Sequence, residues 1–196
     1  CSRATETKTF TAIGDGTLLT MTHSTIAGTR PSGKTGDLGS GIDLANGAQA
    51  KLSGVRVVGN HSAGLRMWGQ ATRAEASRIL IDHTQPSQAT GTIGLGINVA
   101  EGAHLTLRQA RVSHNHASGI VVQDPGSRLQ AEDLVVDHTR PEAADQDLGQ
   151  GMVVSDGEAT VVRGLFLANR SLGLGVELAQ GRAVLAGVAV VDTLPQ

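Results

Sequence analysis

The sequence predicts an all-β solenoid of about seven coils, and three observations support that fold class. The chain repeats itself without gaps, at the constant interval that separates Pro31 from Pro86 and Pro86 from Pro141. Apolar and polar residues alternate in short runs such as Leu105-Thr106-Leu107, which is typical of strands. There are 26 glycines but two phenylalanines, one tryptophan and no tyrosine, an aliphatic and turn-rich composition that favours many short strands. The other repeating columns are Gly39, Gly94 and Gly149; Gly41, Gly96 and Gly151; Gly47, Gly102 and Gly157; and Asp82, Asp137 and Asp192.

Each repeat unit divides into two coils, because the pattern Gly-apolar-x-apolar occurs twice in it. The coil starts, in order, are Gly41, Gly64, Gly96, Gly119, Gly151 and Gly175, and shorter and longer intervals alternate between them. We expect these glycines to supply positive φ or close backbone approach at the corners. The apolar residues after them predict two inward columns, Ile42, Leu65, Ile97, Ile120, Met152 and Val176, and Leu44, Met67, Val99, Val122, Val154 and Leu178. A further alternating run, such as Val55-Arg56-Val57, completes each coil, and a long loop follows on alternate coils.

A coil of this length with three short strands, stacked in parallel on its neighbours, resembles the right-handed parallel β-helices of the pectin-lyase-like superfold. The resemblance covers residues 10–196 and implies the fold, not an activity. The double unit, with its Asp-(His)-Thr-x-Pro corner, also resembles repeats of uncharacterised surface proteins of myxobacteria and related bacteria. We therefore expect an N-terminal segment or cap at 1–15 and a repeat domain at 16–196 that continues beyond the C-terminal end.

Charge and composition narrow the function classes. The formal net charge is −2, so no basic field predicts nucleic-acid binding. No apolar run approaches the roughly 18 residues of a transmembrane segment. Cys1 is the sole cysteine, so no internal disulfide is expected, and no motif implies a cofactor. The opening Cys-Ser resembles the mature end of a bacterial lipoprotein, which makes Cys1 a candidate lipid anchor; the alternative is an arbitrary fragment boundary.

Enzymes of the superfold that the chain resembles act on the outer face of one parallel sheet, so the outward column of the first strands is the first candidate site. It reads Asp43, Arg66, Asn98, Val121, Val153 and Glu177. A glycosidase needs two carboxylates roughly 5 to 9.5 Å apart. Asp43 and Glu177 lie five coils apart, about 24 Å at the strand spacing. Asp43 and Arg66 are interpreted as a cross-strand ion pair.

A corner rich in histidine is the second candidate. His83, His114, His116 and His138 fall near the end of the third strand in successive coils, and imidazoles beside carboxylates can bind Zn²⁺ or Cu²⁺. Two registers stay open, one that stacks His61, His83, His116 and His138 and one that stacks His83, His114 and His138. The alternative is a polar turn ladder, in which Asn and Asp bond the corner backbone and the histidines face water.

The long loops are the third candidate, because loops on alternate coils should form a row about 10 Å apart on one side of a rigid scaffold. Their polar residues suit a carbohydrate or a partner protein: Arg30, Lys34, Asp37, Arg140, Asp145 and Asp147. The alternative is an ordinary solvated insertion. Trp68 lies at an outward corner, where it either stacks on a sugar ring or packs against its neighbours.

These observations favour a non-catalytic, secreted or bacterial cell-surface solenoid with a structural, adhesive or ligand-binding role. Its expected partners are a polysaccharide or another surface protein. The alternative is a polysaccharide lyase or glycoside hydrolase of the pectin-lyase-like superfold, which a close pair of carboxylates or an acidic metal site would favour.

Overall fold

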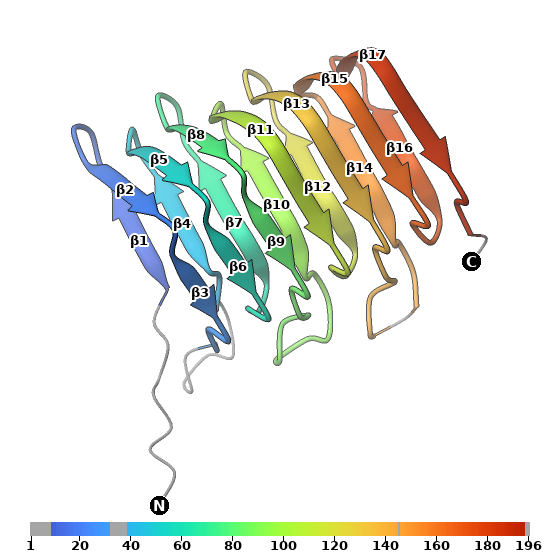
Figure 1. The fold of residues 1–196 in the computed structure, drawn as a ribbon, viewed down its shortest axis with the longest axis horizontal. Coiled ribbons are helices and arrows are strands. Elements are labelled where there is room, and N and C mark those ends of the chain that lie inside the picture. Colours follow the sequence, from blue (N-terminus) through green and yellow to red (C-terminus); the bar gives the residue numbers. More distant parts are fainter. Residues whose placement is uncertain (1–8, 32–38, 145, 195–196) are drawn as a thin grey trace, which may run out of the picture.

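The computed structural model describes residues 9–31, 39–144 and 146–194, and these residues form seventeen strands and no helix. All paired strands run parallel, and equivalent strands of successive coils lie side by side along the long axis (Figure 1). The strands form seven coils, so the predicted all-β parallel β-helix is confirmed. The chain reaches this fold because the alternation of its short apolar runs places one face of every strand inside the coil.

The first strands of the seven coils form one parallel sheet in sequence order. They are β1 (Phe10–Ile13), β4 (Ile42–Ala45), β7 (Ala63–Trp68), β10 (Leu95–Ala100), β12 (Ser118–Gln123), β14 (Gln150–Ser155) and β16 (Leu172–Glu177). β1 pairs with β4 from Phe10 onward. The sheet therefore begins inside the segment 1–15 that the sequence assigned to an N-terminal segment or cap.

The second and third strands of each coil form a second, bent sheet. In coils 1–3 they are separate strands: β2 (Leu18–Thr22) and β3 (Thr25–Ala27), β5 (Gln49–Ser53) and β6 (Arg56–Val58), and β8 (Arg73–Ser77) and β9 (Leu80–Asp82). In coils 4–7 they merge into the longer strands β11 (His104–Ser113), β13 (Arg128–Asp137), β15 (Glu158–Leu167) and β17 (Arg182–Val191). Each merged strand bends at one residue of positive φ, for example Gln109 at 54° and Asp133 at 56°.

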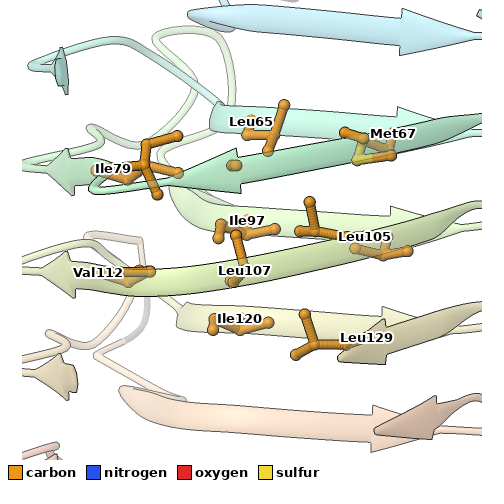
Figure 2. Close-up of a cluster of buried hydrophobic side chains, with 14 of the residues drawn as sticks. Leu65, Met67, Ile79, Ile97, Leu105, Leu107, Val112, Ile120 and Leu129 are labelled. Carbon is orange, nitrogen blue, oxygen red and sulfur yellow. The ribbon is translucent and has the colours of Figure 1, made fainter. Parts of the chain in front are cut away.

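The core is a set of aliphatic columns between the two sheets, and Figure 2 shows its central part. Ile97 lies opposite Leu65 on one side and Ile120 on the other, and all three are fully buried. Leu105 and Leu107 face them from β11, each 1% exposed. Because one coil supplies only a few such side chains, a coil is stabilised mainly by the coils stacked on it.

The glycines at the coil starts make room for the core. A Cβ on Gly119 would lie 2.5 Å from Val136 Cγ1 and 2.6 Å from the carbonyl oxygen of Gly151. The glycines at the starts of the neighbouring coils are crowded in the same way. The predicted close backbone approach is therefore the reason for this glycine column.

A buried ladder of alternating threonine and asparagine explains why the repeat spans two coils. Asn115 Oδ1 accepts a hydrogen bond from the Thr84 backbone N–H at 2.9 Å, and its Nδ2 donates to the Ile81 carbonyl at 3.4 Å. Asn60 bonds Thr29 in the coil before it, and Asn169 bonds Thr139. Coils 1, 3 and 5 thus end in Thr-x-Pro, while coils 2, 4 and 6 supply the asparagine that bonds the preceding corner.

The predicted register of the seventh coil is wrong. Leu174 and Val176 pair with Met152 and Val154, so the coil starts at Gly173 rather than Gly175. Both glycines begin a Gly-apolar-x-apolar pattern, and the sequence cannot distinguish them. Gly175, not Glu177, faces outward beside Val153.

A shortened corner in coil 6 displaces the last of the repeating columns. The corner runs from Ala100 to His104 in coil 4, the equivalent coil one repeat earlier, but from Ser155 to Glu158 in coil 6, so it is one residue shorter. The amide of Ala168 bonds the carbonyl of Val191, which places Val191, and not Asp192, in the column of Asp82 and Asp137. The constant repeat interval therefore fails after this corner.

Candidate functional site

The long loops after β9 and after β13 project from one edge of the solenoid, as predicted for loops on alternate coils. Figure 1 shows the loops after β9 and after β13 on the same side. They touch each other: the Ala144 amide donates to the Gly91 carbonyl at 3.2 Å, and the Ile93 amide donates to Glu142 Oε1 at 2.9 Å. Two loops that are one repeat unit apart in the sequence thus form one continuous rim.

The loop residues predicted to bind a ligand lie in different environments. Lys34, Asp37 and Asp145 lie outside the described residues. Arg30 is exposed at the start of the first long loop. Asp147 accepts a hydrogen bond from the Leu148 amide at 2.9 Å, so its carboxylate supports its own loop. Arg140 differs from these because it opens onto a hollow in the surface.

The structure selects the second of the two histidine registers. The imidazoles of His83, His114 and His138 stack, with ring centroids 4.7 and 4.9 Å apart and planes 14° and 17° from parallel. All three residues have positive φ, between 51° and 56°, and each amide bonds a carbonyl of the next coil. The corner itself therefore sets the spacing of the rings.

Asp82 is the carboxylate partner of the first two rings in this stack. His83 Nδ1 lies 2.9 Å from Asp82 Oδ2, and His114 Nδ1 lies 3.3 Å from Asp82 Oδ1. Ser113 Oγ also lies 2.8 Å from His114 Nδ1. One carboxylate thus bridges imidazoles from two coils.

Asp137, two coils further along the same column, has a different environment. Arg111 holds both its oxygens, at 2.7 Å from Nη2 and 3.2 Å from Nε, and His138 Nδ1 lies 3.0 Å from Oδ2. Burial raises the pKa of Asp137, but the hydrogen bonds from Arg111, Ser113 and His138 outweigh it, so this pKa lies below its ordinary value. Asp137 is therefore held as a carboxylate.

His116 lies outside the stack, in a neighbouring column. Its backbone forms a parallel β-bridge with the backbone of Arg140 in the next coil, and its Nδ1 lies 3.0 Å from the Thr84 carbonyl oxygen. Burial lowers the pKa of His116, and the nearby charge of Arg140 lowers it further, while the hydrogen bond to Thr84 opposes both. The lowered pKa favours the neutral form of His116, so Arg140 supplies the positive charge of the surface that the two residues share.

That surface is an open hollow of about 500 Å³ beside the last long loop, which we call the histidine–arginine hollow. None of its described lining residues is acidic. The side chains of Arg140 and Arg170 are exposed and form no ion pair or hydrogen bond within residues 9–31, 39–144 and 146–194. The lining consists of His114, His116, His138, Thr139, Arg140, Pro141, Ala143, Gln146, Ala168, Arg170 and Leu194.

Arg170 was missed by the sequence analysis. It occupies the position of His116 one unit later, since Gly149 faces its Cβ as Gly94 faces that of His116. The interval from His116 to Arg170 falls one position short of the repeat because of the shortened corner in coil 6. An alignment that allowed one deletion could have found it.

On the outer face of the first sheet, the predicted ion pair is confirmed. Arg66 bonds Asp43 through two hydrogen bonds, at 2.9 and 3.1 Å, directly across from it in the neighbouring strand. The Arg66 guanidinium also lies 4.4 Å from the centre of the Trp68 ring, so Trp68 packs against it. Of the two roles considered for Trp68, this contact supports packing against a neighbour rather than stacking on a sugar ring.

A groove of about 330 Å³ lies between this sheet face and the long loops. Ile93, Glu142 and Leu148 line it from the loops, and Arg66 and Asn98 from the strands. Asn98 Oδ1 is buried and has no hydrogen-bond partner among the residues that the structure describes. The sequence did not indicate this groove, because its loop and strand residues are far apart in the chain.

The family model for a right handed beta helix region matches residues 12–186. The chain belongs to the right-handed β-helix family. The match agrees with the parallel coils described above and indicates that they wind in a right-handed helix. No curated protein and no solved structure matches this β-helix chain. Across the described parts of the chain, no helix is long and apolar enough to span a membrane.

Proposed function

We propose that this β-helix is a non-catalytic binding scaffold whose histidine–arginine hollow holds an acidic polysaccharide. The observation that carries the proposal is the pair of exposed guanidinium groups, Arg140 and Arg170, that have no partner among the described residues and lie beside three imidazoles. Carboxylate and sulfate groups are the natural ligands of such guanidinium groups, because they accept two parallel hydrogen bonds.

The location of the hollow supports a polymer as the ligand. It is open rather than enclosed, and it lies beside the rim formed by the long loops. The whole chain carries a formal net charge of −2, so this basic surface is local and not a consequence of overall charge. A chain of sugar acids can lie along such a surface and present one acidic group to each arginine.

Two groups of carboxylates in the described chain lack the properties of a hydrolase pair. Asp82 and Asp137 lie two coils apart, about 10 Å, and Asp137 has both oxygens held by Arg111. Glu132 and Asp133 are adjacent, and Arg163 bonds both; its hydrogen bond keeps the pKa of Asp133 below the ordinary value. A glycosidase acid needs a raised pKa, and neither Asp137 nor Asp133 has one.

Secretion or attachment to a bacterial surface is part of the same proposal. It rests on the resemblance of the double-coil repeat to surface proteins and on Cys1 as a lipid-anchor candidate, which lies outside the described residues. A scaffold that binds acidic polysaccharide would act there as an adhesive or wall-binding element.

The test is electrophoresis of the native chain, with a chelator present, through gels that contain a polyuronate, a sulfated polysaccharide or a neutral glucan. We expect retardation in the acidic gels alone and a weaker effect at higher salt. The double variant Arg140→Ser/Arg170→Ser should migrate as it does without polymer.

The matched control is Arg73→Ser/Arg108→Ser, which removes two exposed arginines of the second sheet and changes the charge equally. It should still be retarded. Equal loss of retardation in both double variants would refute the hollow as the site, and unchanged mobility of the native chain in every gel would refute polysaccharide binding. A cleared track would show depolymerisation and replace the proposal with the lyase or hydrolase alternative.

A further inference from the structure

The stacked corner contains a group of side chains with the arrangement of a metal site. Asp82, His83 and His114 each offer one ligand atom, and these atoms all lie within 4.8 Å of one another. Both imidazoles direct Nδ1 toward the same carboxylate, at 2.9 and 3.3 Å. The side chains are partly exposed, 21% for Asp82, 44% for His83 and 30% for His114, so an ion can reach them from solvent.

These separations match the requirements of a tetrahedral ion. Zn²⁺ binds imidazole nitrogen and carboxylate oxygen at about 2.0 to 2.2 Å, so two ligand atoms at the tetrahedral angle lie about 3.3 Å apart. Each Nδ1 lies at about this distance from one oxygen of Asp82, His83 from Oδ2 and His114 from Oδ1, so the two oxygens face different rings. To share one ion, the partly exposed carboxylate and rings must rotate so that the three ligand atoms, now within 4.8 Å of one another, converge, and the Ser113 hydroxyl must turn away from His114 Nδ1.

The third ring of the stack is an internal contrast. His138 Nδ1 faces Asp137, but Arg111 occupies both oxygens of that carboxylate and neutralises its charge. The carboxylate of Asp82 bonds no guanidinium among the described residues; its partners there are the two imidazoles. The same column therefore holds one carboxylate that is available to a cation and one that is not.

We propose that Asp82, His83 and His114 bind one Zn²⁺ ion, with water completing the coordination. His138 and His116 are not ligands, since His138 faces the occupied carboxylate and His116 Nδ1 bonds the Thr84 carbonyl. The ion binds Nδ1 of each ring, and the ring proton of each neutral imidazole then resides on Nε2. Because the ion joins residues of two coils, binding fastens coil 3 to coil 4.

The test is titration of the purified chain with ZnCl₂, followed by calorimetry and by thermal unfolding. We expect saturation at one ion per chain, a rise in the unfolding temperature, and reversal by a chelator. MgCl₂ should have no effect, because Mg²⁺ prefers oxygen ligands in an octahedral site. The variants His83→Gln, His114→Gln and Asp82→Asn should each weaken Zn²⁺ binding by about tenfold or more.

The matched controls are His138→Gln and His116→Gln, which should bind Zn²⁺ as the native chain does. Circular dichroism of each metal-free variant checks that the β-helix is intact, and calorimetry on the folded variants separates binding from stability. The proposal is wrong if the native chain does not bind Zn²⁺, if His83→Gln binds as well as the native chain, or if His138→Gln loses as much affinity as His83→Gln. The last result would indicate a general imidazole surface instead of this site.

Discussion

Asp82 and Asp137 occupy equivalent positions two coils apart, yet their neighbours give them different properties. Asp137 is 1% exposed and its carboxylate is hydrogen-bonded by Arg111 across one coil. The Asp82 carboxylate contacts imidazoles in the described chain, and Arg111 acts on it only through its charge, without a hydrogen bond. A buried carboxylate is stable only while its charge is matched by hydrogen-bond donors and a cation. At the residue scale, therefore, one arginine distinguishes a structural carboxylate from a candidate ligand.

We predict that Arg111→Met destabilises the chain by about 1 to 3 kcal/mol, because it leaves the buried Asp137 carboxylate without its cation. The measurement is the midpoint of urea unfolding. The control, Arg163→Met, removes an arginine that bonds two exposed carboxylates, Glu132 and Asp133, so the midpoint should hardly move. Equal midpoints for both variants would show that burial of Asp137 does not matter.

The corner after the third strand is the element on which the double-coil repeat depends. Odd coils carry a threonine and a long loop at this corner, and even coils carry an asparagine that bonds the odd coil before it. Thr84, Ile81 and Asn115 are all buried, so the Thr84 amide and the Ile81 carbonyl that Asn115 bonds have no access to water. At the same corner, the backbone of each stacked histidine has a positive φ, in the left-handed region.

At this scale we predict that Asn115→Ala costs roughly 1 to 3 kcal/mol of stability, since the buried Thr84 amide loses its acceptor. Hydrogen exchange should become faster at that amide, which localises the effect. Gln130→Ala, an exposed substitution on the second sheet, is the control and should leave both quantities unchanged. A protected Thr84 amide in the asparagine variant would contradict the account of the ladder given above.

In the whole molecule, the stacking of coils on neighbours makes stability depend on position along the solenoid. Leu107 and Leu185 lie in the same inward column, in coils 4 and 7. Leu107 is 1% exposed, whereas Leu185 is 43% exposed because no coil in the described part of the chain covers β17 on its outer side. Leucines at equivalent positions of equivalent strands therefore contribute unequally to the free energy of unfolding.

For the 196-residue chain, we predict that Leu107→Ala costs about 2 to 5 kcal/mol, the usual range for a buried leucine. Leu185→Ala should cost much less, because its side chain already contacts water. Thermal unfolding of both variants measures the difference. A larger loss for Leu185→Ala would mean that the last coil is covered in solution, for example by another chain.

The sequence by itself determined the repeat, the strands and the inward columns of coils 2–6, because period-two alternation and recurring glycines are local signals; in coil 7 two glycines offered two registers. It also predicted the Asp43–Arg66 pair correctly, since unambiguous glycines set the register of those two strands. Only the tertiary structure decided which histidines stack, that Arg111 holds Asp137, and that Arg140 and Arg170 share a hollow. These contacts join residues of different coils, so they depend on the register between coils. For the histidines the sequence left two registers open, and for Arg170 one shortened corner in coil 6 shifts its position by a single residue from the repeat. A shift of one residue changes which side chains meet.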